Sequence, residues 1–225
     1  MRAKAQKKRR TQKERRRHTQ EAVLSAAIQV LLEDGYLKFS ASRVAAKAGV
    51  SRGAQEHYFS TKNALVAAAA RYAMDKAIAH ATSLASSANR SSDPITKFLA
   101  DSEHFFFDPT YRAMTEIAFS ARVQPSIAGK YRRIVKDARD VLNAIWLEAL
   151  AKAGHPRKNA QQFIDLTHYL LRGMFFASVW LPYHTDRRAL LDTWAELAPY
   201  ALKRGGPIDR AKRRASSNGR ERHLR

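Results

Sequence analysis

Two short segments on either side of Gly49 restrict the fold of this chain more than any other feature. Each of them, 41–48 and 52–59, follows a serine that can cap a helix and carries apolar residues on one side. Neither is long enough to be a stable helix alone, so both must pack on a neighbouring element. Glycine permits the positive φ of a tight turn, and a small residue at Ala45 permits a close helix crossing. The pattern predicts a helix-turn-helix.

Apolar residues recur with helical spacing along the chain, and no stretch shows the alternation typical of a strand. The first helix is expected to begin after an N-cap at Thr19 and to end at a left-handed C-cap at Gly35. Pro199 should kink the last helix or end it early. The predicted fold is all-α, with an N-terminal three-helix domain and a C-terminal helical bundle. The expected helices are 20–34, 41–48, 52–59, 62–83, 94–106, 109–122, 126–153, 159–181 and 186–203.

The 225 residues carry 41 Lys and Arg against 20 Asp and Glu, a formal net charge of +21. Much of the excess lies at the two ends: residues 1–17 hold ten basic residues and one acid, and residues 203–225 hold nine and two. Charge runs of this kind are typical of solvated segments that bind a polyanion. We expect a flexible basic arm over 1–17 and a flexible basic tail over 205–225. Nucleic acid is the favoured partner, and residues 15–17 would reach phosphates or the minor groove.

Composition and motif spacing exclude several classes of protein. The chain has no cysteine, which excludes disulfides, thiolate zinc sites and cysteine nucleophiles. We expect no metal and no cofactor, because no histidine pair has ligand spacing and no glycine-rich phosphate loop occurs. No apolar run approaches the ~18 residues that span a membrane, so an integral membrane protein is not expected. The missing cysteine fits a reducing, cytoplasmic setting, which is the expected localisation. Residues 49–53 fit the G-x-S-x-G motif of hydrolases, but that motif needs a strand before the serine. No enzymatic activity is therefore predicted.

A single ungapped run around the helix-turn-helix is the most distinctive part of the sequence. It consists of Val23 to Ala27, Gly35 and Tyr36, Ser40, Val44 and Ala45, Ala48 to Ala54, His57 to Lys62, and Ala64 and Leu65. With this run, the segment 20–66 resembles the DNA-binding domain of TetR-type transcriptional repressors. The resemblance implies a homodimer that binds a palindromic double-stranded DNA operator and is released by a small ligand. We therefore expect a DNA-binding domain at 18–66 and a ligand-binding and dimerisation domain at 67–204.

The resemblance also implies which residues contact DNA. Those that face the bases or the groove are Arg52, Gly53, Ala54, Glu56 and His57, and those that contact phosphates are Ser40, Ser42, Tyr58 and Lys62. Helix N-termini attract anions, Arg52 can bridge guanine O6 and N7, and Glu56 can accept from cytosine N4. Glu56 is nevertheless an acid that faces a polyanion. Gln55 departs from the family pattern, and because it precedes Phe59 by four residues, we expect it to lie toward the core and hydrogen-bond locally.

The C-terminal region is rich in aromatic residues, most of which we expect in the core. Some of them can line an apolar ligand cavity. The candidates are His104, Phe105, Tyr111, Met114, Phe119, Trp146, His168 and Phe176. The segments 159–181 and 186–203 have wider apolar faces than one antiparallel pair can bury, and we expect them to form a two-fold, four-helix homodimer interface. The alternative is that these faces belong to the core of one chain.

Two hypotheses about function remain. The first is a dimeric, ligand-responsive, sequence-specific DNA-binding regulator, most simply a repressor of a palindromic operator. The second is a nucleic-acid-binding protein without sequence preference, driven by the basic tails. Removal of the tails separates the two, because a sequence-specific regulator keeps its ranking of sites.

Overall fold

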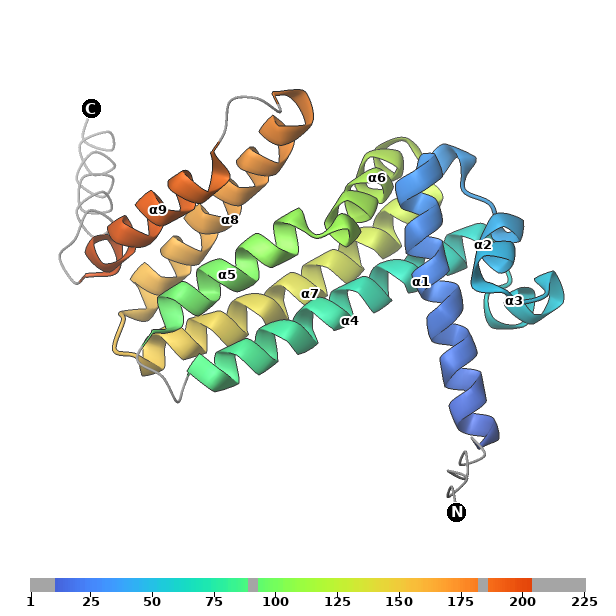
Figure 1. Cartoon of the computed structure of the whole chain (residues 1–225), viewed down its shortest axis with the longest axis horizontal. Helices are drawn as coiled ribbons and strands as arrows, with labels where there is room; N and C mark the ends of the chain where they lie inside the picture. The colour runs from blue at the N-terminus through green and yellow to red at the C-terminus, as the bar shows by residue number, and fades with distance from the viewer. Residues whose placement is uncertain (1–10, 89–92, 182–185, 204–225) are drawn as a thin grey trace, which may run out of the picture. The chain divides into compact units, whose positions relative to one another are not determined.

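The computed structural model describes residues 11–88, 93–181 and 186–203, and this part of the chain forms nine α-helices (Figure 1). Within these ranges no strand occurs, which confirms the prediction of an all-α fold. The helices are α1 (Gln12–Lys38), α2 (Ala41–Ala48), α3 (Arg52–Tyr58), α4 (Lys62–Ala88), α5 (Pro94–Phe107), α6 (Pro109–Val123), α7 (Pro125–Lys152), α8 (Arg157–Trp180) and α9 (Arg187–Leu202).

Helix α1 begins earlier than the sequence pattern indicated. Thr11 is its N-cap and forms a capping box: the Thr11 Oγ1 accepts from the Glu14 N–H at 3.2 Å, and Glu14 Oε2 accepts from the Thr11 N–H at 2.7 Å. Thr19 lies inside the helix, where its hydroxyl donates to the Arg15 carbonyl. The expected N-cap at Thr19 is therefore wrong, and residues 12–17 of the expected flexible arm are helical. Residues 1–10 of that arm and the expected tail at 205–225 lie outside the described residues.

The end of α1 shows why Gly35 is a glycine. Its φ of +67° is the predicted positive value, but its ψ of 173° differs from that of a left-handed cap. The chain resumes one helical turn after it and reaches its C-cap at Phe39. Tyr36 and Phe39 are buried, so the continued turn places two large rings in the core. The regular helix is therefore interrupted at the predicted residue, and one further helical turn follows before Phe39.

Two further helix ends differ from the prediction. Helix α4 extends to Ala88 instead of 83. Helix α9 continues past Pro199 to Leu202, so of the two expected effects of this proline, a kink or an early end, the early end does not occur. A proline in the last turn removes one backbone hydrogen bond, and Ala198, Ala201 and Leu202 are buried around it. Packing of that last turn compensates for the missing bond.

The chain divides into two compact units, Met1–Ala73 with Arg112–Val135 and Met74–Tyr111 with Lys136–Arg225. Helices α4, α6 and α7 each contribute residues to both. In the first unit, α2 contacts α1 on one side and α3 on the other. Its core joins buried residues of the helix-turn-helix to those of α1 and the start of α4: Val23, Leu24, Ala27, Val30, Leu31, Tyr36, Phe39, Val44, Ala45, Phe59, Leu65 and Val66.

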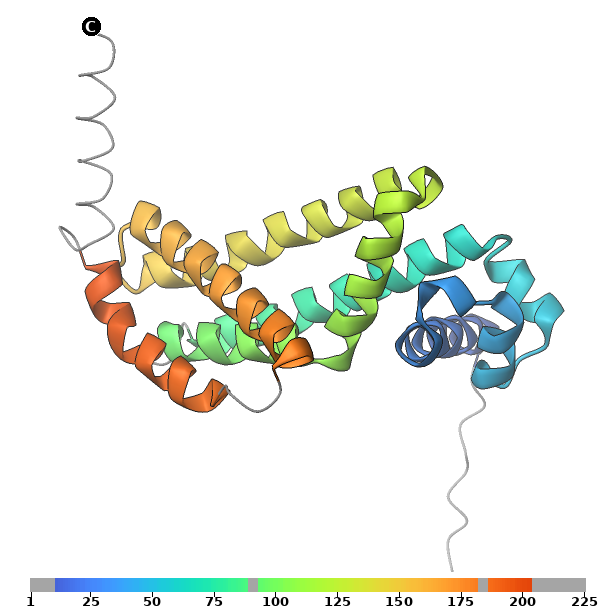
Figure 2. The same ribbon diagram turned by 90° about the horizontal axis from the view of Figure 1, so that it is seen from above.

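In the second unit, α5 contacts both α8 and α9, and α9 runs back along α8 (Figures 1 and 2). The main core cluster takes residues from helices α4, α5, α7, α8 and α9, and Phe98 lies among its aromatic rings. Its large buried members are Phe98, Trp146, Leu150, Phe163, Ile164 and Leu202. A smaller cluster around Phe106 and Leu171 adjoins α9 through Leu191.

Candidate nucleic-acid interface

The turn between α2 and α3 has the geometry that the sequence predicts. Gly49 adopts φ +66° and ψ +31°, the left-handed conformation, and its N–H bonds to the carbonyls of Ala45 and Ala46. The Val50 N–H bonds to the Ala45 carbonyl at 3.0 Å. Ala45 is buried, as is Val44 beside it, so the small residue lies at the contact with the neighbouring helices. The predicted role of this glycine is confirmed.

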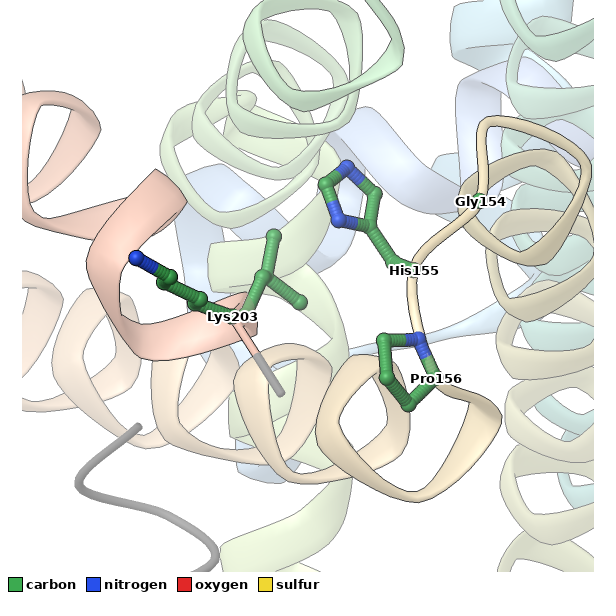
Figure 3. A pocket seen from close by; sticks show the side chains of 5 residues that line it. Gly154, His155, Pro156 and Lys203 are labelled. Carbon is green, nitrogen blue, oxygen red and sulfur yellow. The ribbon is translucent and has the colours of Figure 1, made fainter. Parts of the chain in front are cut away.

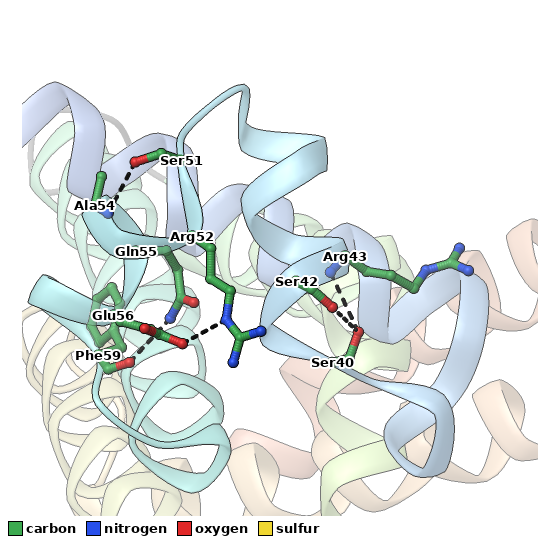
Figure 4. Close-up of polar contacts among 9 residues, drawn as sticks. All are labelled: Ser40, Ser42, Arg43, Ser51, Arg52, Ala54, Gln55, Glu56 and Phe59. Carbon is green, nitrogen blue, oxygen red and sulfur yellow. Dashed lines mark hydrogen bonds and ion pairs between the residues drawn. The ribbon is translucent and has the colours of Figure 1, made fainter.

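Serines cap both helices of the motif (Figure 4). The Ser40 Oγ accepts from the Arg43 N–H at 3.3 Å, and the Ser51 Oγ accepts from the Ala54 N–H at 3.2 Å. Ser42 is exposed, and its hydroxyl lies 3.2 Å from that of Ser40. Ser51 follows a helix and a turn and acts as a cap, which is not the strand context that a hydrolase serine requires.

Helix α3 has one buried side and one open side. Gln55 and its C-cap, Phe59, are buried, whereas the predicted base-facing residues Arg52, Gly53, Glu56 and His57 are exposed. Ala54 and Tyr58 are half-buried at the edges. A Cβ built on Gly53 would meet nothing within 4 Å, so the backbone is open there to an approaching partner. The helix therefore packs on the protein through the side that holds Gln55 and exposes the opposite side, which carries the predicted base-facing residues.

Gln55 behaves as the sequence indicated. Its side chain is 0% exposed, and its Nε2 donates to the Phe59 carbonyl at 3.1 Å. Its Oε1 is buried without a hydrogen-bond partner. The amide satisfies the end of its own helix, so it is not available to a base. This local bond also fixes the position at which α3 stops.

Arg52 and Glu56 form an ion pair on the open side of α3. The Arg52 Nε donates to Glu56 Oε1 at 2.7 Å, and both side chains remain solvent-exposed (Figure 4). The hydrogen bond and the charge of Glu56 raise the pKa of Arg52. The pair uses Nε and leaves the two Nη nitrogens for an outside acceptor. The acid that sequence analysis placed opposite a polyanion is thus partly neutralised within its own helix.

Lys62 has an inward contact that the sequence did not predict. Its Nζ donates to the Tyr36 carbonyl at 2.8 Å and lies 4.4 Å from the centre of the Tyr36 ring. Burial lowers the pKa of the half-buried ammonium. The side chain therefore ties the first turn of α4 to the last turn of α1. An ammonium has three donors, so this bond leaves capacity for a phosphate.

Tyr36 is the centre of a polar contact that joins distant parts of the first unit. Its hydroxyl lies 3.0 Å from Asn63 Oδ1 and 2.9 Å from Gln124 Oε1. The Asn63 Nδ2 donates to the Ser126 hydroxyl at 3.0 Å. Burial raises the pKa of Tyr36. Sequence analysis singled out Tyr36 only as part of a motif, because its partner Gln124 is 88 residues away.

Comparison with known proteins identifies the family of this chain. A sequence model for bacterial regulatory proteins of the tetR family matches residues 23–69, the segment that contains the helix-turn-helix. The HTH-type transcriptional regulator CymR of Pseudomonas putida is 32% identical over 173 residues, which cover 77% of this chain and 85% of that protein. The chain belongs to the tetR family. The resemblance found in residues 20–66 is thereby confirmed.

Solved structures extend the similarity beyond the matched segment. A transcriptional regulator from Rhodococcus sp. Rha1 is 25% identical with a TM-score of 0.59, over 81% of this chain and 95% of that chain. The fatty acid degradation regulator FadR from Bacillus halodurans is 19% identical with a TM-score of 0.60, over 85% of this chain and 96% of that chain. The TetR-family fold therefore covers the second unit as well as the first.

In this TetR-family chain, the predicted ligand residues divide between the two units. Met114 and Phe119 belong to the first unit, where Met114 is buried and Phe119 is 59% exposed. The other six belong to the second unit: His104, Phe105, Tyr111, Trp146, His168 and Phe176. Of these six, His104 is exposed and its ring lies 4.6 Å from that of His80. Exposed side chains such as His104 and Phe119 do not support an enclosed cavity.

His168 connects two groups of aromatic rings in the second unit. Its ring lies 5.9 Å from Phe98, which contacts Trp146, and 5.6 Å from Phe106, which contacts Phe105 and Tyr111. The pKa of His168 is lowered to about 4, mainly by burial and also by the charges of Arg139 and Arg172, against a smaller opposite effect of Asp165. A neutral imidazole therefore lies among rings that sequence analysis had named separately.

A buried carboxylate near these rings was missed by the sequence analysis. Asp101 is only 7% exposed; its Oδ2 accepts from the Trp146 Nε1–H at 2.7 Å, and its Oδ1 lies 2.7 Å from His80 Nδ1. Its position on an apolar helix face was the available signal, because a carboxylate is seldom buried without partners. The bond to Trp146 gives that predicted ligand residue a structural role.

A pocket of about 420 Å³ lies where the α7–α8 loop meets the end of α9 (Figure 3). It is lined by Gly154, His155, Pro156, Leu202 and Lys203, and none of the eight predicted ligand residues reaches it. Burial lowers the pKa of His155.

In the part of the chain that the structure describes, no helix is long and apolar enough to cross a membrane.

Proposed function

We propose that this TetR-family protein is a dimeric repressor that binds an inverted-repeat DNA operator through α3 and is released by a small apolar or amphipathic ligand. The observation that carries the proposal is the two-sided character of α3. Gln55 and Phe59 anchor its back, while Arg52, Gly53 and His57 lie exposed along its front. A helix of this kind fits the major groove with its N-terminal residues toward the base edges.

Contacts to the DNA backbone would come from the ends of the two short helices. The N-terminus of α2 carries Ser40 and the exposed Ser42, and the N-terminus of α3 carries Ser51. Free backbone N–H groups at a helix N-terminus favour phosphate oxygens. Tyr58 and Lys62 would add side-chain contacts beside them. Phosphate contacts of this kind set the register of the protein on the duplex without reading the sequence.

Exposed apolar residues support a dimer through α8 and α9. On α8, Leu166 and Tyr169 are 48% and 61% exposed, and Gly173 follows on the same stripe at helical spacing. A Cβ at Gly173 would meet nothing within 4 Å, which leaves room for a close helix contact. On α9, a matching stripe consists of Leu190, Leu197 and Tyr200, which are 45%, 49% and 55% exposed. Two such stripes related by a two-fold axis would bury each other.

The aromatic group around His168 supports a ligand site in the second unit. Phe105, Tyr111, Trp146, His168 and Phe176 come from α5, α6, α7 and α8, and they are linked through the rings of Phe98, Phe106 and Phe175. A ligand that separates these rings would shift the helices that carry them. Such a ligand would bias the protein toward a spacing of the two α3 helices that no longer matches one turn of DNA, near ~34 Å.

Selection of bound sequences from random duplex DNA tests the proposal. The expected result is an enriched inverted repeat with half-sites about one helical turn apart. The variant Arg52→Ala should relax the preference at particular bases, and the variant Ser42→Ala should weaken binding to all sites equally. If no inverted repeat is enriched, or if both variants weaken all sites to the same extent, the assignment of α3 as the reading helix is wrong.

Removal of residues 1–10 and 205–225 separates this function from tail-driven binding to any nucleic acid. We expect the truncated protein to bind more weakly and with less salt dependence, because cationic residues are removed. Its ranking of selected sites should stay the same. Loss of nearly all binding, without any remaining site preference, would instead support the non-specific protein.

A further inference from the structure

We infer that the first three turns of α1 form a rigid helical extension that contacts the backbone of the duplex beside the operator half-site. This inference deepens the proposed function and rests on it. The segment was expected to be a flexible arm, but the capping box of Thr11 and Glu14 starts the helix at Gln12. Residues 11–21 are exposed apart from the half-buried Thr19, and the first buried residue of α1 is Val23. In Figure 1 these turns extend beyond α2 and α3.

Three of the four lysine and arginine residues of this extension lie on one side of it, namely Lys13, Arg16 and Arg17, whereas Arg15 lies on another side. Seven residues make almost two whole turns of an α-helix, so Arg16 lies on the same side as Val23, and Arg17 on the same side as Leu24. Val23 and Leu24 are buried in the first unit. Lys13 continues this side one turn earlier, by the i, i+3 and i, i+4 spacing. One face of α1 is therefore apolar where the protein covers it and cationic where the protein does not.

The position of these cations lowers the stability of the first turns of α1 when no DNA is bound. Cations near a helix N-terminus oppose the positive end of the macrodipole. Lys13 also repels Arg16 and Arg17, which lie three and four residues after it on the same face. The capping box and an ion pair between Arg17 and Glu21 at 3.6 Å offset part of this cost. Stability of the helix does not explain the cations, whereas a polyanion along this face would remove both unfavourable terms.

The partner that fits is the sugar-phosphate backbone of double-stranded DNA. A duplex carries one negative charge per about 1.7 Å of axis, which matches a row of cations spaced along a helix. The same unit already presents α3 to DNA in the proposed function, so a backbone contact by α1 lengthens the footprint on the same molecule. Such contacts add affinity and salt dependence but no sequence information.

The salt dependence of binding to the selected operator measures this contact. The variant Arg16→Gln/Arg17→Gln should lower the slope of log K against log salt by about 0.9 for each phosphate that the variant no longer neutralises. Its selected sequence should be unchanged. The matched control is Lys130→Gln/Arg133→Gln, which removes two exposed cations from α7 in the same unit and should keep the wild-type slope.

Two further variants separate a rigid, directed contact from charge alone. Arg16→Gln/His18→Arg keeps the number of arginines but moves one by about 200° around the helix. Its slope should fall as much as that of Arg16→Gln by itself. Thr11→Val removes the cap without changing any charge and should also lower the slope, because the first turn frays.

Wild-type slopes for both of these variants would show that only net charge matters, and the inference would be wrong. Failure of the proposed function looks different: the unaltered protein would then select no inverted repeat at all. A lowered slope for Lys130→Gln/Arg133→Gln equal to that of the α1 variant would also overturn the inference, since the effect would not be specific to α1.

Discussion

The helix-turn-helix and the second unit of this TetR-family protein hold some of their polar side chains in different ways. In the helix-turn-helix, Ser40, Ser51 and Arg52 each bond to a residue three or four positions along the chain, and they stay accessible to solvent. In the second unit, Asp101 is buried and accepts a hydrogen bond from Trp146, 45 residues away. The comparison teaches that locally held groups remain available to an outside partner, whereas distantly held groups are used to join helices.

This contrast predicts where a substitution will change stability and where it will change DNA binding. Removal of a buried, long-range partner should unfold the protein with little effect on which DNA sites it prefers. Removal of an exposed, locally held group should do the reverse.

The largest effect is expected for Asp101→Ala. The change leaves the Trp146 N–H buried without an acceptor and removes the partner of His80. We expect the free energy of unfolding to fall by about 3 kcal/mol, measured by chemical denaturation. Asp137→Ala, on an exposed aspartate of α7, is the control and should change stability by less than about 0.5 kcal/mol. A decrease of under about 1 kcal/mol for Asp101→Ala would contradict a structural role for this carboxylate.

The second effect is a dependence of stability on pH that arises from His168. Its pKa is lowered from 6.5 to about 4 in the folded protein, so between these values the unfolded chain binds a proton that the folded chain does not. Stability should therefore fall as the pH falls from about 6.5 to about 4, by at most about 3 kcal/mol. Denaturation at a series of pH values measures it. His168→Gln should flatten this part of the profile, and His57→Gln, at an exposed site, should leave it in place.

Substitution by alanine is expected to have opposite effects on stability at two glycines of the helix-turn-helix. Gly49→Ala forces a side chain into a positive φ and should destabilise the protein by about 1–2 kcal/mol. Gly53→Ala lies inside α3 and should stabilise it by up to about 1 kcal/mol, because alanine favours a helix. Gly53→Ala should nevertheless weaken DNA binding, since its methyl group would stand where the groove approaches. Thermal unfolding and mobility-shift assays measure the two properties; tighter DNA binding by Gly53→Ala would contradict the proposed interface.

The smallest effect is expected for Lys62→Met. Lys62 is half-buried and forms a long-range hydrogen bond, but it is also a candidate contact to a DNA phosphate. The methionine keeps an apolar stem but cannot form the bond to the Tyr36 carbonyl, so stability should fall by about 1 kcal/mol. If Lys62 also contacts a phosphate, the salt slope of operator binding should fall by about 0.9 per half-site. We expect both changes. An unchanged slope would remove Lys62 from the phosphate-contacting set and leave it the structural role alone.

Much of the fold and the open side of α3 were predictable from sequence, because their signals act over short distances. Ser51 caps α3 three residues along, and Gly49 adopts the left-handed turn that its position indicated. The burial of Gln55 followed from its spacing to Phe59. Neighbouring residues also encode the early start of α1, through the Thr11–Glu14 capping box. The dense positive charge around this box nevertheless favoured the prediction of an unstructured arm.

The helix-turn-helix and the outward-facing residues of α3 follow from the amino-acid sequence alone, since caps, turns and helical spacing depend on neighbours within one or two turns. The hydrogen bonds of Tyr36 with Gln124, of Trp146 with Asp101, and of the Lys62 ammonium with the Tyr36 carbonyl became visible only in the folded chain. These contacts join residues 88, 45 and 26 positions apart. Such pairs depend on how whole helices pack, and no local pattern of residue types records that packing.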